Sequence, residues 1–208
     1  MNDGASDQPV LGRRKRRDAV ENRERILHVA RRLFATQGVD ATSMNEIAQV
    51  AQVGPGTLYR CFAHKAELSE ALLSEEIAAF WRQVDATLLP DAPGSALSQL
   101  DWFLDALLRM TESNMSLFAV LWEVLKPRQQ AYQNPLYSAV HQRISHLLSK
   151  AVAQGETGDL DVSFVADAIL AAITPTLYDF QRQFRHFSRE RILAGMRRLF
   201  TDGLRVLS

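Results

Sequence analysis

The sequence predicts an all-α protein of nine helices, and three observations support this fold class. Apolar side chains recur at the i, i+3, i+4, i+7 spacing of a helix face over most of the 208 residues. Serine, aspartate, proline and glycine stand at the intervals expected of helix starts and stops. No segment alternates apolar and polar residues in the way that is typical of a strand. With 47% hydrophobic residues, the chain can bury a real core.

The first predicted helix follows a polar start. Residues 1–12 show no periodicity, and five consecutive cations occupy positions 13–17 (Arg13, Arg14, Lys15, Arg16 and Arg17). We expect residues 1–17 to form a disordered tail that carries a basic arm. A helix is predicted from Asp18, because five apolar residues then share one face: Ile26, Val29, Ala30, Leu33 and Phe34. Gly38 supplies its left-handed stop.

The next two predicted helices are short. Ser43 and Glu46 have the spacing of a capping box, in which the serine accepts from a first-turn amide and the glutamate reaches back. After Val53 the chain is expected to turn at Gly54. It restarts with Pro55, whose missing N–H costs nothing at the first helical position. This third helix is expected to end near Cys61.

Six further helices are predicted over the rest of the chain. A long one begins near His64 and stops before Pro90, and the next follows the break at residues 93–95. Residues 115–125 are apolar on nearly every side, which indicates a central helix. The last three end near Gly155, begin at the cap Asp161 and begin at the cap Ser188. Pro175 falls within the eighth helix and should kink it, because proline removes one backbone hydrogen bond.

Charge is divided unevenly along a chain whose formal net charge is zero. Residues 1–65 hold 11 Lys and Arg against 7 Asp and Glu, whereas residues 66–208 hold 13 against 17. A basic head on an acidic body is expected when only the head meets phosphate. The single cysteine, Cys61, excludes an internal disulfide. No apolar run reaches the length of a membrane span, and the start lacks the apolar core of a signal peptide, so we expect a cytoplasmic protein without a membrane partner.

The layout of the head predicts a DNA-reading helix-turn-helix, in which a short third helix enters the major groove. Pro55 and Gly56 would let the backbone approach base edges, and Thr57 could contact a base edge or a thymine methyl group. Phosphate contacts, which position the protein rather than specify sequence, are expected from six residues: Thr42, Ser43, Tyr59, Arg60, His64 and Lys65.

These residues carry a resemblance. Over residues 26–68, the pattern with Gly38, Thr42-Ser43, Ile47-Ala48, Gly56-Thr57-Leu58-Tyr59, Phe62 and Lys65 resembles the DNA-binding domain of the TetR family. The resemblance covers about a third of the chain. It implies a homodimeric repressor of nine helices whose C-terminal domain binds a small molecule. It also implies DNA contacts from Thr42, Ser43, Gly56, Thr57, Tyr59 and Lys65. Cys61 departs from the family pattern, which commonly has an aromatic residue or histidine there.

Several of these features have a simpler reading. Leu58 and Phe62 are core positions rather than contacts. Thr42 and Ser43 could serve only as a helix cap, and Arg60 could be an ordinary exposed cation. The basic arm could be a solvated tail or could follow the DNA backbone or minor groove.

The body is rich in aromatic residues, which favours an apolar or aromatic effector. The candidate ligand-binding residues are Trp81, Trp102, Phe103, Phe118, Trp122, Glu123, Tyr137 and Tyr178. Glu123 stands out as a carboxylate in an apolar helix; it could pair with Arg143 or a ligand cation, or face solvent beside Lys126. His141 and His146 are five residues apart and off a common face, so no metal site is expected. The last two helices have wide apolar stripes that could pair two copies or bury against their own body.

Taken together, the sequence predicts a one-component transcriptional regulator with three regions: a tail (1–17), a DNA-binding domain (18–65, with the helix-turn-helix at about 43–62) and a ligand-binding and dimerisation domain (66–208). The partners expected are double-stranded DNA, an effector and a second copy joined through the last two helices. No cofactor is expected. No nucleophile elbow, phosphate loop or paired metal-ligand motif is present, so an enzyme is not expected. A helical adaptor or a ligand-independent DNA-binding protein remains the alternative.

Overall fold

The computed structural model describes residues 8–89, 94–124 and 135–205. The chain divides into two compact units, Met1–Ser74 and Glu75–Ser208, which are described one at a time. Within the described ranges all regular structure is helical and comprises ten α-helices and a short 3-10 helix, Asp202–Leu204. The all-α prediction is therefore confirmed, with ten helices where the sequence predicts nine.

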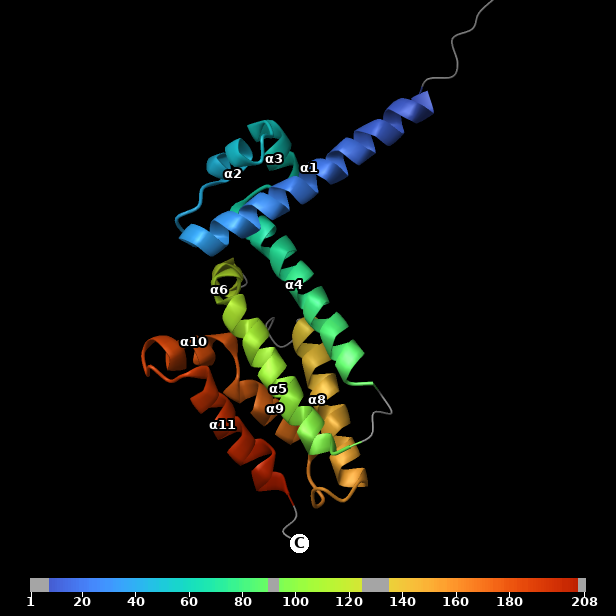
Figure 1. Cartoon of the computed structure of the whole chain (residues 1–208), viewed down its shortest axis with the longest axis vertical. Coiled ribbons are helices and arrows are strands. Elements are labelled where there is room, and N and C mark those ends of the chain that lie inside the picture. Colours follow the sequence, from blue (N-terminus) through green and yellow to red (C-terminus); the bar gives the residue numbers. More distant parts are fainter. Residues whose placement is uncertain (1–7, 90–93, 125–134, 206–208) are drawn as a thin grey trace, which may run out of the picture. The chain divides into compact units, whose positions relative to one another are not determined.

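The first unit contains α1 (Gln8–Gln37), α2 (Met44–Val50), α3 (Pro55–Cys61) and the start of α4 (Lys65–Thr87). Helices α2 and α3 contact each other and both lie against α1 (Figure 1). Fully buried side chains from all four helices form the core: Ile26, Ala30, Ile47, Leu58, Phe62 and Leu68. The apolar spacing of the sequence therefore fixes which face of α1 supports the two short helices.

Helix α1 is longer than the sequence predicts. It begins at Gln8, so residues 8–17 are helical, which corrects the expected disordered tail over 1–17. Arginine and lysine are good helix formers, and nothing between Leu11 and Gln37 interrupts the helix. Residues 1–7 lie outside the described ranges. The predicted stop is confirmed, since Gly38 has φ 88° and its N–H donates to the Phe34 carbonyl at 3.0 Å.

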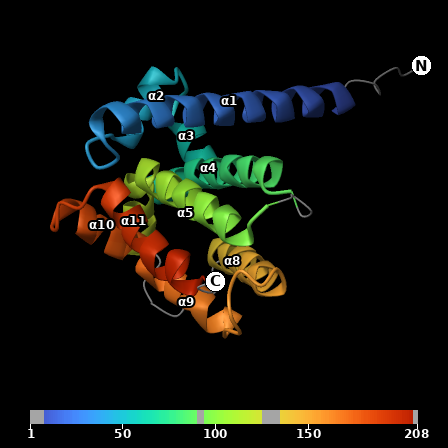
Figure 2. The ribbon, with the colours of Figure 1, turned by 60° about the horizontal axis from the view of Figure 1, so that its bottom comes forward.

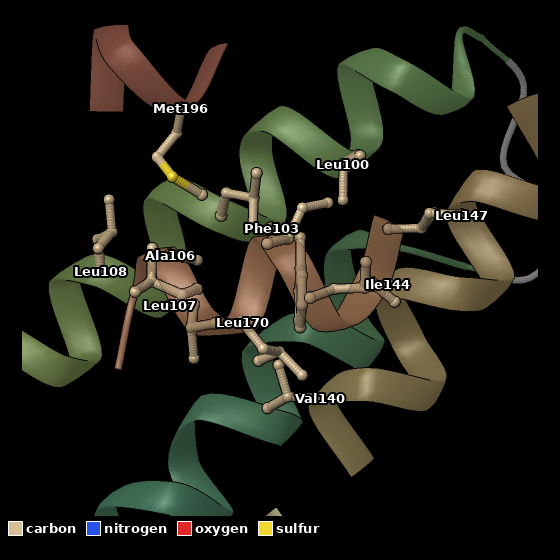
Figure 3. Close-up of a cluster of buried hydrophobic side chains, with 14 of the residues drawn as sticks. Leu100, Phe103, Ala106, Leu107, Leu108, Val140, Ile144, Leu147, Leu170 and Met196 are labelled. Carbon is tan, nitrogen blue, oxygen red and sulfur yellow. The ribbon is translucent and has the colours of Figure 1, made fainter. Parts of the chain in front are cut away.

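The second unit contains the rest of α4 and six further helices: α5 (Ala96–Ser113), α6 (Met115–Val124), α8 (Pro135–Ala153), α9 (Val162–Ala172), α10 (Pro175–Gln183) and α11 (Arg189–Phe200). Helices α5 and α9 each contact both α8 and α11, which makes a four-helix core (Figure 2). Its centre is filled by buried side chains such as Phe103, Ile144, Leu170 and Met196 (Figure 3).

The predicted eighth helix is two helices rather than one kinked helix. It breaks at Ile173 and Thr174, and its halves, α9 and α10, are bent by 41°. Pro175 lies at the start of α10, while the Thr174 side chain accepts the Leu177 N–H at 3.4 Å. A capping threonine directly before a proline favours a new helix start over a kink.

No single helix in the described ranges has the length and apolar composition of a membrane span. The bent pair α9 and α10 meets both criteria only when its two halves are taken together.

Candidate DNA-binding and effector sites

Helix α2 begins with the predicted capping box. Ser43 Oγ accepts the Glu46 N–H at 3.1 Å, and the Glu46 carboxylate reaches back to the Ser43 N–H at 3.5 Å. Gln37, the last residue of α1, donates to the same carboxylate at 2.9 Å. The end of α1 and the start of α2 are therefore joined by side-chain hydrogen bonds, which positions α2 for the turn that follows.

The turn between α2 and α3 differs in detail from the prediction. The left-handed residue is Gln52, with φ 54°, and the Val53 N–H donates to the Ala48 carbonyl at 3.0 Å. Gly54 instead has φ −66° and is the N-cap of α3, followed by Pro55 at the first helical position. The helix end after α2 takes the left-handed form usual at helix C-termini, but a glutamine adopts it.

Helix α3 has one buried and one exposed face. Leu58 is fully buried, as is Phe62 directly after the helix. Gly56, Tyr59 and Arg60 lie on the exposed side, with Tyr59 48% exposed. Thr57 is half-buried, and its hydroxyl accepts the Arg60 guanidinium at 3.2 Å. The core reading of Leu58 and Phe62 is confirmed, and the polar residues of α3 are presented to solvent.

Gly56 is open on its outer side. A Cβ atom built there would meet no heavy atom within 4 Å, so the fold itself does not require glycine at this position. The missing side chain exposes the backbone at the start of α3, which is the end of a recognition helix that approaches base edges.

Three predicted phosphate contacts already have partners inside the unit. The Thr42 side chain is 1% exposed, and its hydroxyl donates to the Gly38 carbonyl at 2.7 Å. This burial corrects the interpretation of its hydroxyl as a phosphate ligand. Lys65 Nζ donates to the carbonyls of Val39 at 2.8 Å and Asp40 at 3.2 Å. The exposed His64 accepts the Glu67 N–H through Nδ1 at 3.1 Å.

The structure adds one residue that the sequence does not single out. Arg23 of α1 lies over the Phe62 ring at 4.4 Å and donates to the Cys61 carbonyl at 3.5 Å. It thereby ties α1 to the end of α3 through a cation–π contact. Cys61 itself is half-buried. In the basic arm, Arg17 pairs with Glu21 at 3.4 Å, while the side chains of residues 8–16 lie outside the described part of the chain.

The candidate ligand residues fall into three groups in the second unit. Phe103 is fully buried in the core, with Trp81 and Trp102 packed against that core. Tyr137 donates to Asp167 at 2.9 Å and stacks on His141. Phe118 and Tyr178 line cavities. The side chains of Trp122 and Glu123 lie outside the described residues, as does Lys126, although the α6 backbone extends to Val124. Arg143, proposed as a partner for Glu123, pairs with Asp85 at 2.6 Å.

Two cavities lie in this unit. One, of about 380 Å³, is lined by Glu112, Tyr178 and Arg182 among others, and the other, of about 550 Å³, by Phe118 and Pro175 among others. Burial, reinforced by the nearby Glu112 carboxylate, raises the pKa of Tyr178 to about 12. The Tyr178 hydroxyl is therefore protonated and neutral at physiological pH.

A three-helix unit with α3 exposed after a supported turn defines the class of protein, a helix-turn-helix transcriptional regulator. The family model of the bacterial regulatory proteins of the tetR family matches residues 26–72. The HTH-type transcriptional regulator SAB2452 of Staphylococcus aureus is 30% identical over 175 residues, which are 84% of this chain and 90% of that protein. The chain belongs to the TetR family.

Solved structures share this fold at low sequence identity. A TetR/AcrR-family regulator from Thermobifida fusca is 22% identical with a TM-score of 0.67, over 88% of this chain and 98% of that one. A transcriptional regulator from Saccharomonospora viridis, solved in complex with choline, is 19% identical with a TM-score of 0.71, over 90% of this chain and all of that one, 100%. As a member of this family, the chain is a DNA-binding transcription factor and not an enzyme.

Proposed function

We propose that the protein is a homodimeric repressor that binds a palindromic operator through α3 and leaves it when a small molecule binds the second unit. The observation that carries the proposal is the exposed side of α3, where Gly56, Tyr59 and Arg60 face solvent. This face holds a bare stretch of backbone, a hydroxyl and a guanidinium, which together suit base edges and phosphates.

Each exposed residue has a role in this proposal. The backbone at Pro55 and Gly56 approaches the base edges, and Thr57 offers its methyl and hydroxyl groups to them. Tyr59 and Arg60 bind phosphates on either side of the groove. Ser43, His64 and Lys65 are outer phosphate contacts; Lys65 has three N–H groups, of which two donate to carbonyls, so one stays available.

A two-fold dimer is needed to place two recognition helices in successive major grooves, about 34–36 Å apart. Support for an interface on the last helices comes from large apolar side chains that stay exposed there. Phe164 is 70% exposed, Phe184 72% and Leu199 66%, and Phe184 stacks on the exposed Phe180 at 5.6 Å. Exposed aromatic and aliphatic groups of this size are typical of a surface that a partner covers.

Helix α4 is the proposed link between ligand and operator. It begins at Lys65 in the first unit and continues to Thr87 in the second, where Phe80 and Val84 join the core. A ligand that shifts α4 would change the spacing of the two recognition helices. Linkage limits the effect to the ligand's preference for one state, and tenfold release of operator needs about 1.4 kcal/mol.

Gly56→Ala tests the DNA-binding assignment without disturbing the fold. Operator fragments are first identified by genomic footprinting, and affinity is then measured by fluorescence anisotropy over a range of salt concentrations. Because a Cβ at Gly56 meets nothing in the protein, we expect unfolding to become no easier. We also expect the added methyl group to weaken operator binding at least tenfold, since it holds the backbone away from the bases.

The matched control is Gly158→Ala, another position where a Cβ meets nothing within 4 Å, which should bind as the wild type does. Wild-type affinity should fall steeply with salt, by a slope of about 0.9 per phosphate contact. Unchanged operator affinity in Gly56→Ala would show that α3 does not read the groove as proposed.

A further inference from the structure

The two cavities of the second unit adjoin each other between α6 and α10. Both are lined by Met115, Asp179 and Gln183, and their volumes are about 380 Å³ and 550 Å³. These values are in the range of small-molecule sites. The shared lining makes them two ends of one site, which we call the α6–α10 site.

One end of the site contains a buried hydroxyl that lacks a partner. The Tyr178 side chain is 1% exposed, and its hydroxyl makes no hydrogen bond within the described residues. Buried polar groups in folded proteins are almost always hydrogen-bonded, and an exception that lines a cavity indicates a partner still to be bound. With its proton retained, this hydroxyl can donate to or accept from a ligand.

The same end has an unbalanced negative charge. Glu112 is neutralised by Arg182 at 2.7 Å and lies 3.7 Å from the Arg189 guanidinium. Arg182 is further held by the Phe187 carbonyl, to which it donates at 2.7 Å. Asp179, in contrast, has no ion pair or hydrogen bond to any side chain that the structure describes, although it lines both cavities. The carboxylate left over at the junction is therefore that of Asp179.

The other end is apolar. Phe118, Ala119 and Pro175 line it together with Met115. A ligand that fills both ends therefore needs an apolar body on one side and a polar group beside Asp179 on the other.

The site stays open in the proposed dimer. Leu177, Phe180 and Phe184 are exposed and share one side of α10, because their spacing of three and four residues follows the helical turn. Asp179 and Gln183 lie four residues apart on a different side, which lines the α6–α10 site. A second copy seated on the apolar side therefore leaves this site to a small molecule.

We propose that the α6–α10 site binds an organic amine. Its charged nitrogen donates to the Asp179 carboxylate and to the Tyr178 hydroxyl, and its apolar body lies along Met115 and Phe118. This inference rests on the proposed function in one respect, since it identifies this amine as the effector that releases operator.

The test uses three probes with one apolar body and different ends: 4-phenylbutylamine, 4-phenylbutan-1-ol and 4-phenylbutyrate. Isothermal titration at pH 7 should show the amine binding at least tenfold more tightly than the alcohol, with the carboxylate weakest. Asp179→Asn should reduce amine affinity about tenfold and leave alcohol affinity unchanged. Tyr178→Phe, which keeps the buried ring, should weaken the amine and the alcohol alike.

Asp159→Asn, an exposed carboxylate elsewhere in the second unit, is the control and should change no affinity. Equal affinity for the three probes, or an Asp179→Asn variant that binds the amine as well as wild type, would overturn the amine site. Operator affinity is measured in the same preparations. If the amine binds through Asp179 and operator affinity does not change, the amine site stands and its role as effector is wrong.

Discussion

Gln52 occupies a backbone conformation that favours glycine. Its φ of 54° lies in the left-handed region, where the Cβ atom of an L-residue meets the following carbonyl at a cost of about 1–2 kcal/mol. The conformation is held by hydrogen bonds on both sides, from Gln52 N–H to the Gln49 carbonyl at 3.1 Å and from Val53 N–H to the Ala48 carbonyl at 3.0 Å. The turn of the helix-turn-helix is therefore maintained by its neighbours against a local preference.

Replacement of Gln52 by glycine should stabilise the first unit. Relief of the Cβ strain outweighs the extra backbone freedom that glycine has in the unfolded chain, so we expect a gain of about 0.5–1 kcal/mol in the free energy of unfolding. Gln49→Gly, three residues earlier inside α2, should instead cost about 1 kcal/mol, since helical backbone disfavours glycine. Urea denaturation measures both variants, and a loss of stability in Gln52→Gly similar to that in Gln49→Gly would contradict the strain argument.

Helix α5 depends on a residue distant in sequence for its start. The Glu156 carboxylate accepts the Ser95 hydroxyl at 2.6 Å and the N–H groups of Ala96 at 2.6 Å and Leu97 at 3.1 Å. These are backbone donors that a helix N-terminus leaves without intrahelical partners. Partial burial by itself would raise the pKa of Glu156, but the hydrogen bonds from Ser95, Leu97 and Ala96 outweigh it and hold the pKa below its usual range.

The lowered pKa of Glu156 makes the stability of α5 depend on pH. A carboxyl whose folded pKa is lowered contributes stability that is complete above its unfolded pKa of about 4.3. That contribution is lost as the pH falls through the lower, folded value. Glu156→Gln should cost about 1–3 kcal/mol at pH 7, because the amide cannot accept these bonds as an anion does. The loss should shrink toward acid pH.

Thermal unfolding from pH 7 down to pH 3, followed by circular dichroism, measures this effect. Asp159→Asn, which replaces an exposed carboxylate nearby in the chain, serves as the control and should follow the wild-type curve. Parallel curves for Glu156→Gln and wild type over the whole range would rule out the cap as the source of the acid sensitivity.

At the scale of the whole molecule, α4 joins a DNA-binding unit to a unit with a ligand site, and the apolar residues of the last helices supply a surface for a second copy. Function then depends on association as well as on folding, because a monomer reaches a single half-site.

The double variant Phe184→Asp with Leu199→Asp should be monomeric. Both side chains are largely exposed, so the charges cost little in the isolated chain, whereas a packed interface would have to bury them. Sedimentation velocity should show one chain per particle, and operator affinity should fall at least a hundredfold. Leu89→Asp, at a site 59% exposed at the end of α4, is the matched control and should stay dimeric. A dimeric double variant would place the interface elsewhere.

Local rules predict much of this molecule from its sequence. The capping box of Ser43 and Glu46, the left-handed Gly38 and the caps Asp161 and Ser188 are all confirmed. Each depends on residues within one helical turn, so neighbouring sequence is sufficient. The fate of Thr42 is different, since its burial follows from the packing of the loop that joins α1 to α2.

The sequence by itself determined the helical fold, most helix boundaries and the exposed side of α3, because apolar periodicity and caps act over a few residues. Tertiary structure decided which polar groups are satisfied and which remain free. Lys65 and Glu156 bind backbone groups 25 or more residues away, whereas Tyr178 and Asp179 are left without partners among the described residues at a cavity. Hydrogen-bond partners of this kind are set by where the chain folds back on itself, and no local pattern encodes that meeting.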